Sequence, residues 1–197
     1  MSTIRTAKFF IIGKTSITKK PSPSQVASLK TIRSNENVKK KILICGIGNT
    51  IRGDDVIGIL LARQLRKEQI PDAEIREMET AGFEILDEMT DFSKVIILDA
   101  MKTNEEEEVG KVVVSSLEEG RPSVSLLPSH GFDFAGLVKA FQKAQPGRIP
   151  KDINFILVKV QRVDEFHEGL SPRLEKDFPL ILENVKRALN QILQYTG

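Results

Sequence analysis

The sequence predicts an α/β protein, a three-layer α/β/α sandwich with a five-stranded sheet that is mostly parallel and can be mixed. Short apolar runs rich in β-branched residues alternate with longer segments of helical period from Lys41 onward, the order expected when helices connect neighbouring strands. One run, KVIILDA at 94–100, is apolar over nearly its whole length, as expected of a strand buried on both faces of a parallel sheet. With 197 residues and 40% hydrophobic content, the chain can bury one good core and is too short for two full-sized domains.

The first predicted unit is the stretch 41–58, KILICGIGNTIRGDDVIG. An apolar strand stops at Gly46, a loop containing Gly48 follows, and an amphipathic helix starts behind Asp54 and Asp55. Such a strand, loop and helix normally place the loop at the carboxyl edge of a parallel sheet, where α/β proteins keep their sites. We therefore expect carboxylates at that edge.

The remaining elements are predicted from the same periodicities. After the first helix, which ends before Pro71, we expect a weaker strand at 73–78, a short helix at 83–89 and a strong strand at 94–100. A fourth strand at 111–115, a loop at 126–132 and a helix at 134–141 follow. The last two elements are a fifth strand at 154–160 and a closing helix at 171–194.

The first forty residues differ in composition from the rest. Residues 1–41 hold ten Lys or Arg and one acidic residue, which gives a net charge of +9. The rest of the chain holds 19 Lys or Arg and 26 acidic residues, which gives a net charge of −7. The stretch 14–40 is rich in Ser, Thr, Lys and Pro without an apolar period, which predicts linker or disorder. We therefore divide the chain into a basic N-terminal extension, 1–40, that is flexible or adds an edge element, and an α/β domain, 41–197. The scattered charges and two aromatic residues of the arm favour a solvated extension, so we expect no nucleic-acid partner.

Cysteine content and hydropathy indicate the compartment. The single cysteine, Cys45, excludes an intramolecular disulfide framework and a cysteine-based metal cluster. It fits a reducing compartment, and we expect a cytoplasmic protein. No stretch approaches the roughly 20 apolar residues of a membrane span, so we expect none.

Three residues are candidates for chemistry at the predicted edge of the sheet. Asp55 follows the first strand and Asp99 ends the third, and the carboxyl ends of parallel strands lie on one edge, so the two side chains can converge. His130 lies in the loop 126–132. Two carboxylates and an imidazole suit a divalent transition metal. For Asp54 and Asp55 the alternative is a cap at a helix start, worth about 0.5–2 kcal/mol, and for His130 it is a surface position.

Other chemistries fit these residues less well. A dinucleotide-binding loop needs a third glycine at the helix start, where Ile51 stands, and Asp54 and Asp55 would repel phosphate. A nucleophilic pair of Cys45 and His130 is disfavoured, because Cys45 lies within an apolar strand and lacks the electropositive surroundings that activate a thiol. The sequence contains no GxSxG elbow and no HExxH helix, so the standard serine and zinc peptidase schemes lack their parts.

Five motifs occur in a specific order: GIGNTIRGDDVIG, VIILDA, SHGF, LVKVQ and EGLSPRLEKDFP. Together they resemble the hydrogenase maturation proteases, the endopeptidases that trim the carboxyl terminus of the large subunit of NiFe hydrogenases. The resemblance covers about Lys41 to Leu193. In that family the proposed metal-contacting residues fall on Asp55, Asp99 and His130, which leaves Asp54 as the residue of the helix start.

The resemblance implies an endopeptidase that removes the C-terminal peptide of a NiFe hydrogenase large-subunit precursor after nickel insertion. The precursor is then the partner and its nickel the recognition element, so we expect no tightly bound catalytic metal in the protein itself. Asp55 or Asp99 would position or activate a water, and the backbone amides of Gly48 and Asn49 could stabilise the oxyanion. We expect His167 to be dispensable. The alternative is a non-enzymatic nickel or nucleotide carrier on the same α/β scaffold.

Overall fold

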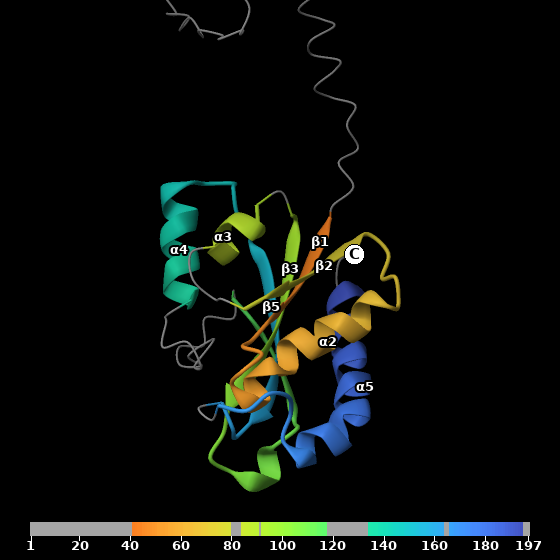
Figure 1. Ribbon diagram of the computed structural model, residues 1–197. Coiled ribbons are helices and arrows are strands. Elements are labelled where there is room, and N and C mark those ends of the chain that lie inside the picture. The colour runs from red at the N-terminus through yellow and green to blue at the C-terminus, as the bar shows by residue number, and fades with distance from the viewer. Residues whose placement is uncertain (1–40, 80–83, 91, 118–133, 164–165, 195–197) are drawn as a thin grey trace, which may run out of the picture. The chain divides into compact units, whose positions relative to one another are not determined.

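The computed structural model describes residues 41–79, 84–90, 92–117, 134–163 and 166–194. The helices and strands in these ranges belong to one unit, Lys39–Gly197 (Figure 1). The predicted extension, 1–40, lies outside the described residues, so its boundary and its role stay predictions. Among the helices that are described, none is long and apolar enough to cross a membrane.

A five-stranded sheet forms the middle layer. Its strands are β1 (Ile42–Ile47), β2 (Ala73–Met78), β3 (Lys94–Lys102), β4 (Val112–Ser116) and β5 (Asp152–Val160). Their order across the sheet is β2-β1-β3-β5-β4, in which the first four strands are parallel and the edge strand β4 is antiparallel to β5. The predicted sheet, mostly parallel and mixed, is confirmed.

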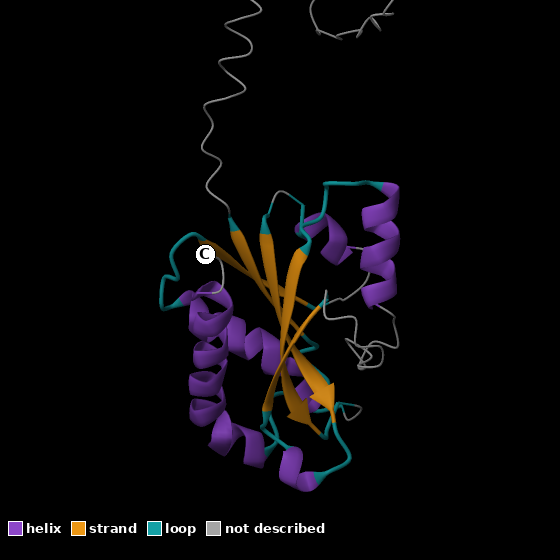
Figure 2. Ribbon diagram, turned by 180° about the vertical axis from the view of Figure 1, so that it is seen from behind, coloured by secondary structure: helices purple, strands orange, loops and turns teal. Residues whose placement is uncertain are grey.

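Helices cover both faces of the sheet (Figures 1 and 2). One face is covered by α2 (Ile57–Arg66) and α5 (Pro172–Gln194), and the other by α3 (Glu84–Glu88) and α4 (Phe134–Ala144). Two short 3₁₀ helices follow β1 and β3, namely η1 (Gly53–Val56) and η2 (Glu106–Glu108). The three-layer α/β/α sandwich is confirmed.

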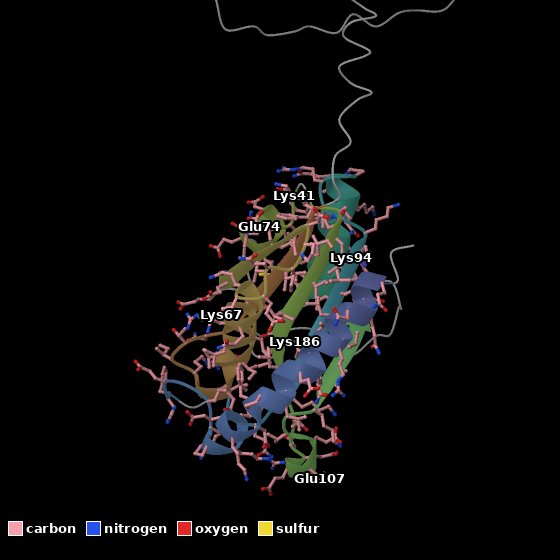
Figure 3. All side chains as sticks on the ribbon, turned by 90° about the vertical axis from the view of Figure 1, so that its right-hand side faces the viewer. Lys41, Lys67, Glu74, Lys94, Glu107 and Lys186 are labelled. Atoms are coloured by element: carbon pink, nitrogen blue, oxygen red, sulfur yellow. The ribbon has the colours of Figure 1, made fainter. Side chains whose placement is uncertain are left out.

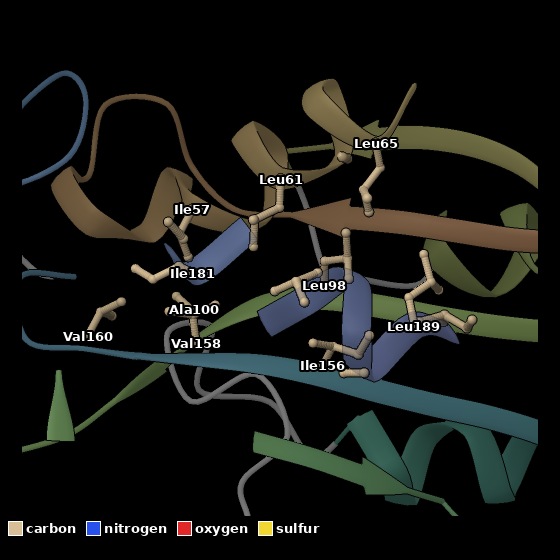
Figure 4. Packing of buried hydrophobic residues seen from close by; sticks show 14 of the residues in the cluster. Ile57, Leu61, Leu65, Leu98, Ala100, Ile156, Val158, Val160, Ile181 and Leu189 are labelled. Carbon is tan, nitrogen blue, oxygen red and sulfur yellow. The ribbon is translucent and has the colours of Figure 1, made fainter. Parts of the chain in front are cut away.

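The alternation of side chains along β3 explains why both faces need a helical layer. Ile96 and Leu98 belong to the core under α2 and α5, whereas Val95 and Ile97 belong to the core under α3 and α4, and all four are fully buried. Figure 4 shows part of the first core, with Leu98 in the same cluster as Leu61 of α2. Each fully buried aliphatic side chain contributes about 1.5–3 kcal/mol, so the central strands are strongly held.

Helix α2 begins in direct contact with the backbones of two strands. A Cβ atom on Gly58 would lie 2.2 Å from the carbonyl oxygen of Ile47 and 2.4 Å from that of Leu98. Only glycine permits so close an approach. The start of α2, with η1 before it, is thereby brought against β1 and β3.

The long helix α5 is fixed near both of its ends. The backbone N–H of Ser171, the residue before the helix, donates to Asp54 Oδ1 at 2.6 Å. Near the other end, the buried Lys94 Nζ donates to the carbonyl oxygen of Ile192 at 2.9 Å and forms an ion pair with Asp152 at 3.1 Å. Lys94 is labelled in Figure 3, where α5 crosses in front of the sheet. A lysine at this place also opposes the partial negative charge of the helix C-terminus.

Candidate functional site

The strand order reverses between the carboxyl ends of β1 and β3, which is the position where α/β folds form their ligand-binding crevice. From β1 the chain passes through α2 to β2 on one side, and then through α3 to β3 on the other side, and the two helices lie on opposite faces. This reversal of strand order opens the crevice in which α/β proteins bind their ligands. The 3₁₀ helix η1 starts shortly after β1 and contacts β3, so it borders this crevice.

Asp99 reaches the crevice from β3. The pairing of β1 with β3 ends at Gly46 and Leu98, so Asp99 is the first residue of β3 beyond that pairing. The predicted strand end at Asp99 is wrong, because β3 continues to Lys102 alongside β5. At Asp99, β3 therefore still pairs with β5 but no longer with β1. The side chain of Asp99 is fully buried.

Asp55 reaches the same crevice from η1, and it too is fully buried. The loop after β1 folds back tightly against it, since a Cβ atom on Gly48 would lie 2.1 Å from the carbonyl oxygen of Asp55. The backbone N–H of Gly48 donates to the carbonyl oxygen of Met78 at 3.2 Å. This hydrogen bond joins the loop to β2, and the oxyanion-stabilising role of the Gly48 and Asn49 amides stays a prediction.

The two carboxyl groups interact in the protein interior. Burial raises the pKa of Asp99 well above its ordinary value, and the negative charge of Asp55 raises it further. The backbone N–H of Ala100 opposes this rise without reaching hydrogen-bond geometry, and within the described residues neither carboxylate oxygen of Asp99 accepts a hydrogen bond. An ionised carboxylate is costly in such surroundings unless a proton or a cation compensates it. The pair is therefore suited to taking up positive charge.

Comparison with known proteins shows the family of this chain. The family model described as hydrogenase maturation protease matches residues 59–188, a range that includes Asp99. This chain belongs to the hydrogenase maturation protease family. The hydrogenase 2 maturation protease of Escherichia coli K12 is 28% identical to it over 153 residues, which cover 77% of this chain and 92% of that relative.

Solved structures of hydrogenase maturation proteases share the fold. The hydrogenase maturating endopeptidase HybD from Escherichia coli matches with a TM-score of 0.57 at 28% identity, over 77% of this chain and 93% of that one. The NiFe hydrogenase maturation protease HycI from Thermococcus kodakarensis matches with a TM-score of 0.56 at 26% identity, over 85% and 99% of the two chains. The family assignment made from the sequence motifs is confirmed.

The third metal-contacting residue that the family resemblance predicts, His130, lies outside the described residues. It stands four positions before Phe134, the first residue of α4. In the part of the chain that the structure describes, no group of three or more His, Cys, Asp or Glu residues comes together. The structure thus brings the buried carboxyl groups of Asp55 and Asp99 close enough to interact, and the contribution of His130 stays a prediction.

Asp54 has a different role in this hydrogenase maturation protease from the predicted one. The helix η1 has no side-chain cap hydrogen bond. Instead, Asp54 Oδ1 accepts a hydrogen bond from the N–H of Ser171 at 2.6 Å, and Oδ2 accepts one from the N–H of Arg162 at 3.4 Å. Asp54 does lie in the first turn of η1, as predicted, but it is no cap: its side chain, 1% exposed, turns toward distant backbone donors that compensate its burial.

The segment between β5 and α5 borders the site, which the sequence reasoning missed. The backbone of this segment is hydrogen-bonded to the residues that precede Asp55. The N–H of Asp54 donates to the carbonyl oxygen of Arg162 at 2.9 Å, and that of Gly53 donates to His167 at 2.7 Å. In return, the N–H of His167 donates to Ile51 at 3.2 Å. The available signal was the motif EGLSPRLEKDFP, part of the family resemblance. The His167 side chain is exposed, and its dispensability stays a prediction.

Cys45 is unsuited to nucleophilic catalysis, as the sequence predicted. Burial raises the pKa of its thiol to about 12, and the nearby charge of Glu88 adds to the rise. The thiolate is the nucleophilic form of cysteine, so a thiol with this pKa is inert at neutral pH.

Proposed function

We propose that this hydrogenase maturation protease removes the C-terminal peptide of a NiFe hydrogenase large-subunit precursor after nickel insertion, and that it reads the nickel held by the precursor. The observation that carries the proposal is the pair of fully buried carboxylates, Asp55 and Asp99, at the crevice between β1 and β3. In this proposal Asp55, Asp99 and His130 contact the precursor's nickel.

The surroundings of the pair favour recognition of a metal on the substrate over storage of a metal. Asp55, Asp99 and His130 offer oxygen and nitrogen donors to a nickel ion whose remaining ligands are thiolates of the precursor. Affinity then arises when metal and precursor arrive together, because linked binding events reinforce one another. Burial raises the pKa of Asp99 and so favours its protonated form, with which a free metal ion has to compete. We therefore expect no tightly bound metal in the protein alone.

Hydrolysis uses the same carboxylates. The precursor's nickel holds the tail of the precursor in the crevice, so that the scissile carbonyl lies beside Asp55 and Asp99. One of these carboxylates positions a water molecule and accepts its proton as the water oxygen attacks the carbonyl carbon. The proton then passes to the amide nitrogen as the C–N bond breaks. Burial and the nearby negative charge of Asp55 raise the pKa of Asp99, which makes its carboxylate a stronger base than an exposed one.

Cleavage of two matched precursors tests this proposal. The full-length protein is incubated with nickel-loaded and with metal-free large-subunit precursor, and the product masses are measured by mass spectrometry. We expect loss of the C-terminal peptide from the nickel-loaded precursor alone. Equal cleavage of both forms would contradict the reading of nickel, and cleavage of neither would contradict the proposed activity.

Two further measurements complete the test. In a calorimetric titration with nickel alone we expect weak binding; tight binding without any cleavage would favour the alternative of a nickel carrier. The variant His130→Ala should lose cleavage. His167→Ala is the matched control, since it removes the other histidine of the chain from an exposed position, and it should cleave at the wild-type rate.

A further inference from the structure

Two exposed apolar side chains lie beside the candidate site. Among the described residues, Ile51 is 50% exposed and Phe166 is 88% exposed. Ile51 precedes η1 and Phe166 follows β5, so both belong to the carboxyl edge of the parallel strands. The two other exposed large apolar residues of the described chain, Val114 and Leu180, lie away from this edge, on the strand β4 and within the helix α5.

Hydrogen bonds bring these two apolar residues together. The N–H of His167, the residue after Phe166, donates to the carbonyl oxygen of Ile51 at 3.2 Å. The carbonyl oxygen of His167 accepts from the N–H of Gly53 at 2.7 Å, and a parallel bridge pairs His167 with Arg52. The backbones that carry Ile51 and Phe166 are therefore neighbours, and we call these two residues the apolar rim.

The apolar rim is joined to the segment that carries Asp55. Asp54, the residue before Asp55, holds Arg162 and Ser171 through its buried carboxylate and through its own backbone N–H. The rim is thus presented on a hydrogen-bonded framework and not on an isolated loop. A surface held in this way loses little conformational freedom when a partner covers it.

We propose that the apolar rim, Ile51 and Phe166, docks apolar side chains of the polypeptide substrate next to the scissile bond. This inference rests on the proposed function. A protease must hold a polypeptide beside its catalytic groups, and a chain that reaches Asp55 at this edge meets Ile51 and Phe166 on the adjoining segments. A buried phenylalanine removes about 150–250 Å² of surface from water, so an exposed one beside a site is a strong anchor for a partner.

The test compares matched surface substitutions in the full-length protein. Phe166→Ser, Phe166→Leu and Leu180→Ser are assayed for cleavage of nickel-loaded precursor, with KM and kcat measured separately. We expect Phe166→Ser to raise KM about tenfold or more with kcat retained, because a few large aromatic side chains carry most of the binding energy of an interface. Phe166→Leu should raise KM less. Leu180→Ser, which removes another exposed apolar side chain, 58% exposed, from α5, should leave both constants unchanged.

Several outcomes would overturn the proposal. An unchanged KM in Phe166→Ser is the first, provided that circular dichroism shows the same fold. If Phe166→Ser instead abolishes a self-association seen by sedimentation and leaves KM unchanged, the rim is an interface between copies of this chain. If the wild-type protein cleaves no precursor, the proposed function fails by itself, and precursor binding measured by calorimetry still decides: equal Kd values for wild type and Phe166→Ser would overturn the docking role.

Discussion

The buried pair Asp55 and Asp99 and the acidic residue Glu108 all lie toward the carboxyl ends of β1 and β3, and they behave in opposite ways. Asp55 and Asp99 are fully buried, and burial raises the pKa of Asp99. Glu108 lies in η2, shortly after β3, where hydrogen bonds from Lys111 and Lys159 lower its pKa to about 2. The surroundings of acidic residues, and not their number, distinguish a site from a surface cluster. Lysines already compensate Glu108, whereas Asp99 lies where added positive charge is favoured.

The largest expected difference between the two groups is in catalysis. Asp55→Ala and Asp99→Ala should each lower the cleavage of nickel-loaded precursor at least about 100-fold, the scale of a lost acid–base or positioning group. Glu108→Ala should cleave near the wild-type rate, because its carboxylate is engaged by lysines outside the crevice. Single-turnover cleavage measures the rates, and circular dichroism checks the fold. Full activity in either aspartate variant would remove that residue from the site.

A smaller effect is expected at Asp54, which is buried like the pair and hydrogen-bonded like Glu108. Asp54→Ala leaves the backbone N–H groups of Ser171 and Arg162 without their acceptor, which should lower the free energy of unfolding by about 1–3 kcal/mol. It should also slow cleavage, because the segment that carries Asp55 is less firmly held. Asp54→Asn retains one acceptor oxygen, so it should lose less stability and less cleavage activity than Asp54→Ala. Denaturant unfolding measures the stabilities, and wild-type stability in Asp54→Ala would show that these hydrogen bonds contribute nothing.

The smallest effect is on the pH dependence of stability, and its sign differs between the two groups. Because the pKa of Asp99 is raised by folding, the native protein loses stability as pH rises from the unfolded value through the folded one. Asp99→Asn removes that loss, so it should gain stability over wild type with rising pH, by roughly 1.4 kcal/mol for each pH unit between the two pKa values. Glu108, with its lowered pKa, contributes stability at neutral pH that is lost as pH falls toward about 2. Unfolding curves at several pH values measure both effects, and parallel curves for wild type and Asp99→Asn would contradict the raised pKa.

The strands and helices could be predicted from the sequence because their signals are local. The run KVIILDA predicted a strand buried on both faces, and β3 has that burial. Its true end at Lys102 could not be predicted, because the last residues are held by pairing with β5, which lies about fifty residues further along the chain. The local sequence pattern shows where an apolar strand begins, whereas pairing with the neighbouring strands of the sheet decides where the strand ends.

The site was predictable to a similar degree. Asp55 and Asp99 could be placed at one edge from the polarity of a parallel sheet, and the structure places both at the crevice. The partners of Asp54 could not be found, because Arg162 and Ser171 are 108 and 117 positions away in the chain. Nothing in the residues around Asp54 distinguishes an acid that caps its own helix from one that holds a distant loop.

The two anchors of α5 also make the length of that helix matter to the site. Ser171 meets Asp54 at the carboxyl edge of the sheet, whereas Ile192 meets Lys94 at the first residue of β3, on the opposite edge. An α-helix rises about 1.5 Å and turns about 100° with each residue. Inserting or deleting a single residue in α5 would therefore swing one anchor away from its partner. The helix acts as a spacer of fixed length, through which a change at the far edge of the sheet would be felt next to Asp55.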